Sequence, residues 1–214
     1  MKIINRQASI KALRLLGSVL AVTALCACSS LGPASTPTTD FYLLDSARVT
    51  ASIPPKTSGP TLIVNPPIAA AGFDSPRIIY VRDSHKLEYF AHSEWVDPPA
   101  RMLGPLLVAA LANTGAFGAV VLTPGAAAGD LRLDTEIIRL QHEFQSQPSR
   151  VRFTLRAILV EDRTRRVVAW REFDGSVAAT SEDPYGGVVA ANQIVQKVVE
   201  DLSSFCVDAM RTAQ

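Results

Sequence analysis

The last quarter of the chain carries a long apolar repeat, and this repeat restricts the fold more than any other stretch. Its apolar residues recur every three or four positions: Val188, Ala191, Val195, Val198, Leu202, Phe205 and Ala209. An α-helix has about 3.6 residues per turn, so these side chains form one stripe along a helix of roughly six turns. Such a helix needs a second layer of structure to cover its stripe.

The segments before this helix predict that layer, because they alternate in the way that half-buried strands do. Residues 130–140 place Leu131, Leu133 and Ile137 opposite acidic and basic neighbours. Residues 150–159 alternate apolar side chains with several arginines. We expect these strands to pair, with opposite charges on their solvent faces. After a polar turn at 161–165, a third strand is expected over 166–177.

The segments between residues 41 and 115 predict shorter elements. We expect strands at 41–44 and 61–64 and a hairpin from 77–82 and 86–90 around the turn Asp83-Ser84-His85. Asp97-Pro98-Pro99 is typical of a helix start, with Asp97 as the cap. That helix ends near residues 113–115, but Pro105 lies within it, so we expect a kink or a later start near Gly104.

A further short strand at 119–122 completes the order β-β-β-β-α-β-β-β-β-α. The predicted fold class is therefore α+β, with a mostly antiparallel sheet and two main helices packed on one face. Residues 41–214 are enough for one domain with a sizeable core.

The N-terminus reads as a bacterial lipoprotein signal. Four basic residues and no acidic one precede an apolar stretch at 15–25, which is too short to span a membrane. Leu25, Ala27 and Cys28 then supply the Leu, small residue and Cys of a lipobox. Cys26 is less suited as the target, because Leu25 would directly precede it. The competing interpretation is an ordinary secretory signal that ends near a cysteine.

The lipobox interpretation divides the chain into three parts. Residues 1–27 are a removed signal peptide, and residues 28–40 are a lipidated N-terminus with a Ser/Thr/Pro-rich tether. Cys28 would carry diacylglycerol and a further acyl chain such as palmitate, and two or more chains hold a protein stably on a membrane. Ser29 follows the anchor where inner-membrane lipoproteins commonly have Asp. We therefore expect the periplasmic face of the outer membrane, with the inner membrane as the alternative.

Charge and cysteine content exclude several classes. Without the four basic residues of the signal, 17 Lys and Arg stand against 20 Asp and Glu in the whole sequence. No dense basic cluster is present, so nucleic-acid binding is not expected. Cys206 has no partner once Cys28 is acylated, and it lies beside the apolar stripe. We interpret it as a small buried hydrophobe rather than a nucleophile.

No catalytic constellation is visible, so the chain is predicted not to be an enzyme. Phosphate-loop, nucleophile-elbow and metalloprotease motifs are all missing from the sequence. We interpret the histidines His85, His92 and His142 as solvated surface residues, since strand alternation does not make them converge on a metal. No cofactor and no metal site are predicted.

The most unusual candidate surface is the aromatic hairpin region at 72–98. It contains five large aromatic residues: Phe73, Tyr80, Tyr89, Phe90 and Trp95. Aromatic side chains are enriched in binding surfaces. The alternative, equally weighted, is that they complete a small core.

Together these features resemble the ABC-type transport auxiliary lipoprotein family. The residues that carry the resemblance are the lipobox and the segments at 41–44, 63–67, 73–80, 94–95 and 131–134, followed by the closing helix. The resemblance implies an accessory lipoprotein that works with an MCE-domain protein, an ABC permease and an ATPase in moving lipids or other hydrophobic molecules. ATP chemistry would then belong to the partner chains.

Three functional hypotheses are compatible with these features. The first is a lipoprotein anchored by Cys28 that docks an MCE assembly, and the second is a periplasmic lipid carrier with an internal apolar cavity. The third, a periplasmic hydrolase, is disfavoured because no nucleophile–base pair is visible. We also consider a homo-oligomer, because the edge strands of such a sheet carry unpaired backbone groups.

Overall fold

The computed structural model describes residues 38–45, 59–124 and 128–212 of the chain. The chain divides into two units, and the second, Thr39–Gln214, holds all the described helices and strands. The predicted signal peptide at 1–27, Cys28 and the tether up to residue 37 lie outside the described residues.

Three long antiparallel strands form the centre of the sheet: β7 (Leu131–Glu143), β8 (Arg150–Glu161) and β9 (Val167–Ala178). All three were predicted from the sequence. The alternation works because paired apolar residues, such as Leu133 opposite Leu159, point to the same face. A register shift between Ile137 and Arg139 moves the later β7 side chains by one position.

The opposite edge of β7 is shared by three short parallel strands: β2 (Thr61–Val64), β3 (Ile68–Ala69) and β4 (Arg77–Val81). Further strands extend these at either end of β7: β6 (Ala119–Leu122) beside β2, then β5 (Glu88–Trp95) beside β4 and β1 (Asp40–Tyr42) beside β5. The nine described strands therefore form a mixed sheet that is largely antiparallel. The predicted α+β class is confirmed, although the parallel pairs and β3 were not predicted.

The two described helices are α2 (Pro99–Asn113) and α3 (Pro184–Thr212). Helix α2 begins before Pro105 and continues through it, so the later start near Gly104 is wrong. The predicted cap is also wrong, because Pro98 occupies the cap position without a side-chain bond. The Asp97 carboxylate instead accepts a bond from Arg101, at 3.1 Å.

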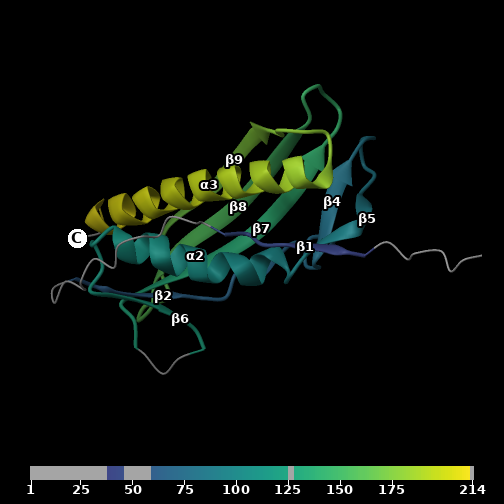
Figure 1. Cartoon of the computed structure of the whole chain (residues 1–214). Coiled ribbons are helices and arrows are strands. Elements are labelled where there is room, and N and C mark those ends of the chain that lie inside the picture. The colour runs from purple at the N-terminus through teal and green to yellow at the C-terminus, as the bar shows by residue number, and fades with distance from the viewer. Residues whose placement is uncertain (1–37, 46–58, 125–127, 213–214) are drawn as a thin grey trace, which may run out of the picture. The chain divides into compact units, whose positions relative to one another are not determined.

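Helix α3 is longer than predicted, at 29 residues. Asp183 caps it, since its Oδ1 accepts a hydrogen bond of 2.7 Å from the Gly186 N–H. Figure 1 shows α3 lying along β8 and β9, with α2 beside it. Gly175 of β9 permits this close approach, because a Cβ there would lie 2.7 Å from Cδ1 of Ile194.

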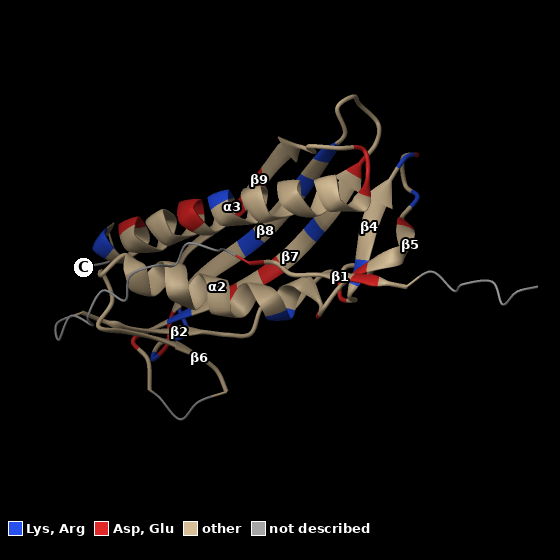
Figure 2. Ribbon diagram, in the orientation of Figure 1, with Lys and Arg blue, Asp and Glu red and all other residues tan. Residues whose placement is uncertain are grey.

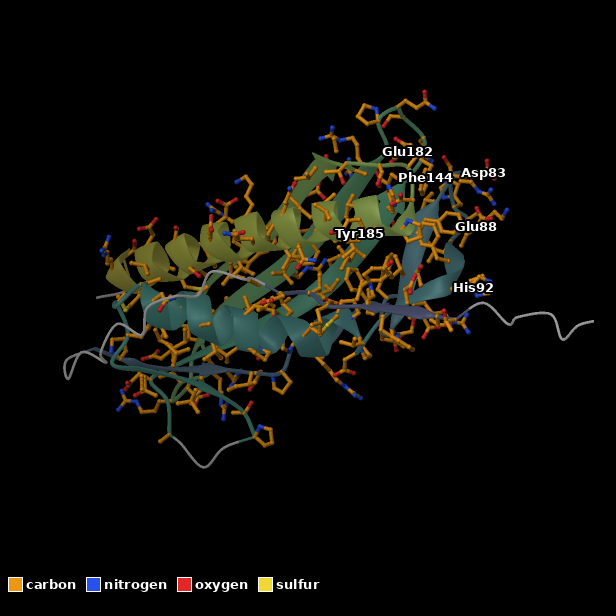
Figure 3. The ribbon with its side chains drawn as sticks, viewed as in Figure 1. Asp83, Glu88, His92, Phe144, Glu182 and Tyr185 are labelled. Carbon is orange, nitrogen blue, oxygen red and sulfur yellow. The ribbon has the colours of Figure 1, made fainter. Side chains whose placement is uncertain are left out.

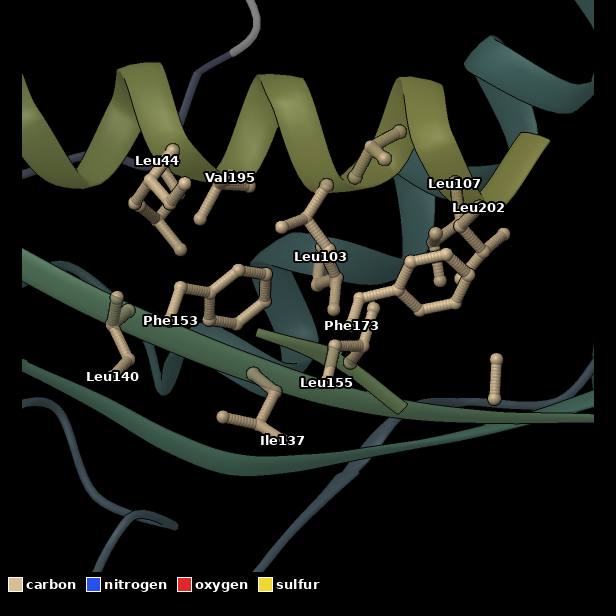
Figure 4. Close-up of a cluster of buried hydrophobic side chains, with 14 of the residues drawn as sticks. Leu44, Leu103, Leu107, Ile137, Leu140, Phe153, Leu155, Phe173, Val195 and Leu202 are labelled. Carbon is tan, nitrogen blue, oxygen red and sulfur yellow. The ribbon is translucent and has the colours of Figure 1, made fainter. Parts of the chain in front are cut away.

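The predicted helical stripe and strand faces meet in one core. Figure 4 shows side chains from β7, β8, β9, α2 and α3 interleaved there, among them Leu103, Ile137, Phe153, Leu155 and Leu202. Cys206 is fully buried in this core, and burial raises the pKa of its thiol to about 12. A thiol of that pKa stays protonated, which agrees with its interpretation as a small hydrophobe.

The side chains of the long strands that alternate with the core residues form the predicted ladder of opposite charges, and the ribbon positions of these charged residues are coloured in Figure 2. Arg156 of β8 pairs with Glu136 of β7 at 3.0 Å and with Glu172 of β9 at 3.3 Å. Cross-strand pairs of this kind contribute about 0.2–1 kcal/mol each. They mark this side as the solvent face of the three strands.

Candidate functional site

The β4–β5 hairpin, predicted from its aromatic residues, has an irregular register. Tyr80 pairs with Glu88 and Ile79 with Tyr89 near the turn, whereas Arg77 pairs with Glu94 at the other end. The extra residues of β5 lie between these pairs and include His92, which is exposed. In the turn, His85 adopts a left-handed backbone conformation, with φ of 67°.

Opposite charges close the hairpin next to the turn. Arg82 Nε donates to Glu88 Oε2 at 2.9 Å, and Lys86 Nζ lies 3.4 Å from the other carboxylate oxygen. The hydrogen bond from Arg82 lowers the pKa of Glu88 to about 2. Glu88 is therefore ionised at neutral pH, and the hairpin end is charged.

The structure corrects the prediction for Trp95. Its side chain is only 4% exposed and belongs to the main core, so it cannot contact a partner. Phe90 is half-buried against the same core, and its ring centre lies 4.6 Å from that of Tyr80. Trp95, and in part Phe90, therefore completes the core, which was the alternative prediction for these aromatic residues.

Tyr89 points to the other face of the hairpin than Phe90, because neighbouring residues of a strand point in opposite directions, and Phe73 lies in the loop before β4. Tyr89 is 38% exposed, and the Arg77 guanidinium carbon lies 4.8 Å from its ring centre. Phe73 lines a shallow depression of about 290 Å³ together with Val81 and Leu87. The five predicted residues therefore do not form one patch.

Sequence reasoning missed the histidine and phenylalanine that complete the inner aromatic cluster. His142 of β7 is buried, and its ring centre lies 4.1 Å from that of Phe144 (Figure 3 labels Phe144). Phe144 in turn meets Tyr80 edge to face, at 5.9 Å. The prediction that the histidines are solvated surface residues is therefore wrong for His142. His85 and His92 are exposed.

His142 is held between the sheet and the start of α3. Its Nε2 lies 2.8 Å from Ser149 Oγ, and the Ser149 N–H donates to Glu182 at 2.9 Å. A Cβ at Gly187 of α3 would lie 2.5 Å from His142 Nδ1, so only glycine fits there without a shift. Burial lowers the pKa of His142, which favours the neutral ring.

A sequence signal for the burial of His142 did exist, since it stands two residues after the apolar Leu140. It was hidden by the register shift after Ile137, which moves the inward positions of β7 from odd to even numbers.

A groove between α2 and α3 is the other notable concave feature. Its volume is about 330 Å³, and Leu106, Ala110, Val195 and Val199 give it an apolar floor. Glu200 and Gln196 of α3 add polar groups at its lining. Apolar clefts of this size with a few polar groups are typical of small-ligand sites.

Among the described residues, no cluster of three or more His, Cys, Asp and Glu side chains could hold a metal ion. The described helices also include none that is both long and apolar enough to cross a membrane.

Comparison with known families identifies one whose model matches most of the chain. The model of the family described as the ABC-type transport auxiliary lipoprotein component matches residues 42–203. The chain belongs to this family, which places it as an accessory lipoprotein of ABC-type transport in the cell envelope. No curated protein matches the sequence.

Solved structures share the fold. A DUF330-family protein from Xanthomonas campestris is 24% identical, with a TM-score of 0.72, and the alignment covers 82% of this chain and 98% of that one. A second, an uncharacterized protein, is 14% identical with a TM-score of 0.63 and coverage of 79% and 99%. A lipoprotein from Neisseria meningitidis is also similar, at 14% identity, a TM-score of 0.36 and coverage of 67% and 98%.

Proposed function

We propose that this protein is anchored through a lipidated Cys28 at the periplasmic face of the outer membrane and docks an MCE assembly. Its role is accessory and non-catalytic, in transport of lipids or other hydrophobic molecules across the envelope. The observation that carries the proposal is the family match over 42–203 in a chain that also has a lipobox. The permease and the ATPase would be indirect partners, reached through the MCE protein.

The exposed face of the β4–β5 hairpin is the proposed docking surface. Arg77 is stacked on Tyr89 there. Tyrosine and arginine are, together with tryptophan, the residue types most enriched at binding hot spots. Leu87 and the depression at Phe73 add apolar area next to it. Tyr80 and Phe90 lie on the inner side and support the hairpin, and Trp95 anchors it in the core.

A pull-down of the MCE-domain protein tests this surface. Tyr89→Asp should weaken capture at least about tenfold, which corresponds to about 1.4 kcal/mol. Trp170→Asp is the matched control, because Trp170 is also an exposed aromatic but lies on β9, far along the sheet order. Equal capture by both variants and the unmodified protein would remove the hairpin as the docking surface.

The anchor is tested separately by Cys28→Ala. We expect a folded protein that is unprocessed or found away from the outer membrane, because the acyl chains cannot be attached. Normal processing, acylation and membrane fractionation of this variant would contradict the proposal at its first step. Sizing of the acylated protein in detergent also tests for a homo-oligomer, since β6 ends the described sheet with an unpaired edge.

The groove between α2 and α3 favours lipid binding as a second candidate function. An internal cavity is less suited, because the space between the sheet and α3 near His142 has a volume of only about 10 Å³. That is room for one water at most. Native mass spectrometry decides: lipid that co-purifies and is displaced by Val199→Trp supports a carrier, and lipid-free protein contradicts it.

A further inference from the structure

An exposed apolar strip lies on β1 and on the residues that directly follow β1 and β5. Phe41 is 62% exposed, Leu43 is 55% exposed and Val96 is 49% exposed. Phe41 pairs with Glu94 and Tyr42 with Trp95 in the parallel register, and Leu43 and Val96 directly follow this last pair on their two chains. We call these three residues the β1 strip.

The β1 strip cannot turn inward, because its neighbours are fixed. Leu44 is buried in the core, and the Val96 N–H donates to the Tyr42 carbonyl at 2.9 Å. Asn192 of α3 holds the chain on both sides of Leu44: its Nδ2 donates to the Leu43 carbonyl at 3.1 Å, and its Oδ1 accepts from the Asp45 N–H at 2.7 Å. Phe41 and Leu43 are therefore held outward by the fold.

The position of the strip in the chain indicates what covers it. Only eleven residues lie between Cys28 and Asp40, where β1 begins, and a fully extended chain over this distance reaches roughly 40 Å. A short tether of this kind keeps a surface at roughly millimolar effective concentration near its anchor. Three partly exposed apolar side chains are then sufficient for a contact that would be negligible in free solution.

The charges around the strip specify the kind of contact. Asp40 and Glu94 flank it, and the nearby Arg101 is paired with Asp97. Acidic neighbours disfavour an anionic surface, so the contact must come from apolar burial rather than from attraction to lipid charge.

We infer that the β1 strip is a membrane-contact surface, which inserts into the headgroup boundary of the bilayer that holds Cys28. This rests on the proposed anchor and adds an orientation to it. The β1 end of β5 faces the lipid, and the hairpin end of β5 is directed away from it toward a partner. Zwitterionic phospholipid is the expected surface.

Fluorescence on vesicles tests the strip without relying on acylation in the cell. The mature chain with Cys28→Ser and an N-terminal polyhistidine tag is held on phosphatidylcholine vesicles by nickel-chelating lipid. An environment-sensitive fluorophore is placed at Leu43→Cys, or at Val167→Cys as the control. Val167 is 51% exposed on β9, so it matches Leu43 in exposure and differs in position. Cys206 is buried and does not compete for the label.

We expect a blue shift at position 43 and loss of emission when the lipids carry nitroxide groups on their acyl chains. Position 167 should keep the emission that it has without vesicles. Phe41→Ser with Val96→Ser should abolish the effect at position 43 and leave the circular dichroism spectrum unchanged, because both side chains are exposed.

Three results would overturn the inference. One is equal behaviour of positions 43 and 167, and another is a contact that forms only when anionic lipid is added. The third is a blue shift without vesicles that grows with protein concentration, which would indicate contact between copies of the chain. The tag replaces the acyl chains in this assay. A negative result on vesicles therefore does not contradict the Cys28 anchor, and a lack of acylation in the cell would not change the vesicle result.

Discussion

His142 shows how one residue can join two layers of the fold. Its ring fills the space that Gly187 leaves between β7 and α3, and its Nε2 reaches Ser149. The negative charges of Glu182 and Asp183 raise the pKa of His142. Burial has the larger effect and lowers this pKa. The neutral ring is therefore part of the folded state.

This predicts a pH dependence of stability in a defined interval. In the unfolded chain the histidine titrates near its ordinary pKa of 6.5, above its value in the fold. As the pH falls through 6.5 the unfolded chain takes up a proton first, so the free energy of unfolding should decrease. Urea unfolding between about pH 7.5 and 5.5 should show this decrease, and His142→Gln should flatten it.

The two neighbouring carboxylates do not change the free energy of unfolding in the same pH interval. The pKa of Glu182 is lowered by the Ser149 N–H and that of Asp183 by the Gly186 N–H. Stability that depends on lowered carboxylate pKa values is lost only below their ordinary values of 4.5 and 3.8. A profile for His142→Gln as steep as that of the unmodified protein between pH 7.5 and 5.5 would show that another group is responsible.

At the scale of elements, the two helices begin in different ways although both starts have an Asp and a proline. Asp183 accepts the Gly186 N–H and caps α3, whereas Asp97 lies one residue too early and binds Arg101 instead. The sequence motifs are nearly the same, and only the second proline at Pro99 moves the start of α2 along the chain.

The matched pair of substitutions Asp183→Ala and Asp97→Ala tests this difference. Asp183→Ala leaves a helix-terminal N–H without its cap, so the Tm should fall by roughly 2–4 °C. Asp97→Ala removes only an exposed pair with Arg101 and should leave the Tm nearly unchanged. Calorimetry or thermal circular dichroism measures both, and a larger loss for Asp97→Ala would mean that Asp97 stabilises α2 after all.

At the scale of the whole molecule, stability is centred on β8. It pairs along almost its full length with β7 on one side and β9 on the other, and α3 covers it. By contrast, β1 and β6 end the described sheet order and are short. The surfaces proposed for binding lie on or near these less protected parts.

Hydrogen exchange followed by mass spectrometry should reproduce this order. Peptides from 151–159 should exchange last, because their amides open only when the whole core opens, and those from 40–44 and 83–88 should exchange early. With vesicles present and the anchor attached, protection should increase at 40–44. Early exchange in 151–159 would contradict a core centred on β8.

Local periodicity was sufficient to predict most elements, since a stripe or an alternation reflects which neighbours share a face. The long strands, the hairpin and α3 were predicted in this way, as was the burial of Cys206. Errors arose where the period breaks: the shift after Ile137 concealed His142, and the extra residues of β5 separated Trp95 from Tyr89. A bulge changes which face a side chain occupies without changing its residue type.

The sequence alone predicted the class of the domain, a lipobox with Cys28 and the family, because periodicity and short motifs can be recognised in single stretches of the chain. Only the tertiary structure decided which aromatic residues are free to bind and that Phe41, Leu43 and Val96 form one strip. Those facts depend on the pairing of β1 with β5 across more than fifty residues and on the α3 residue that holds it. Long-range pairing is chosen by the sum of many weak contacts, which no single stretch of sequence displays.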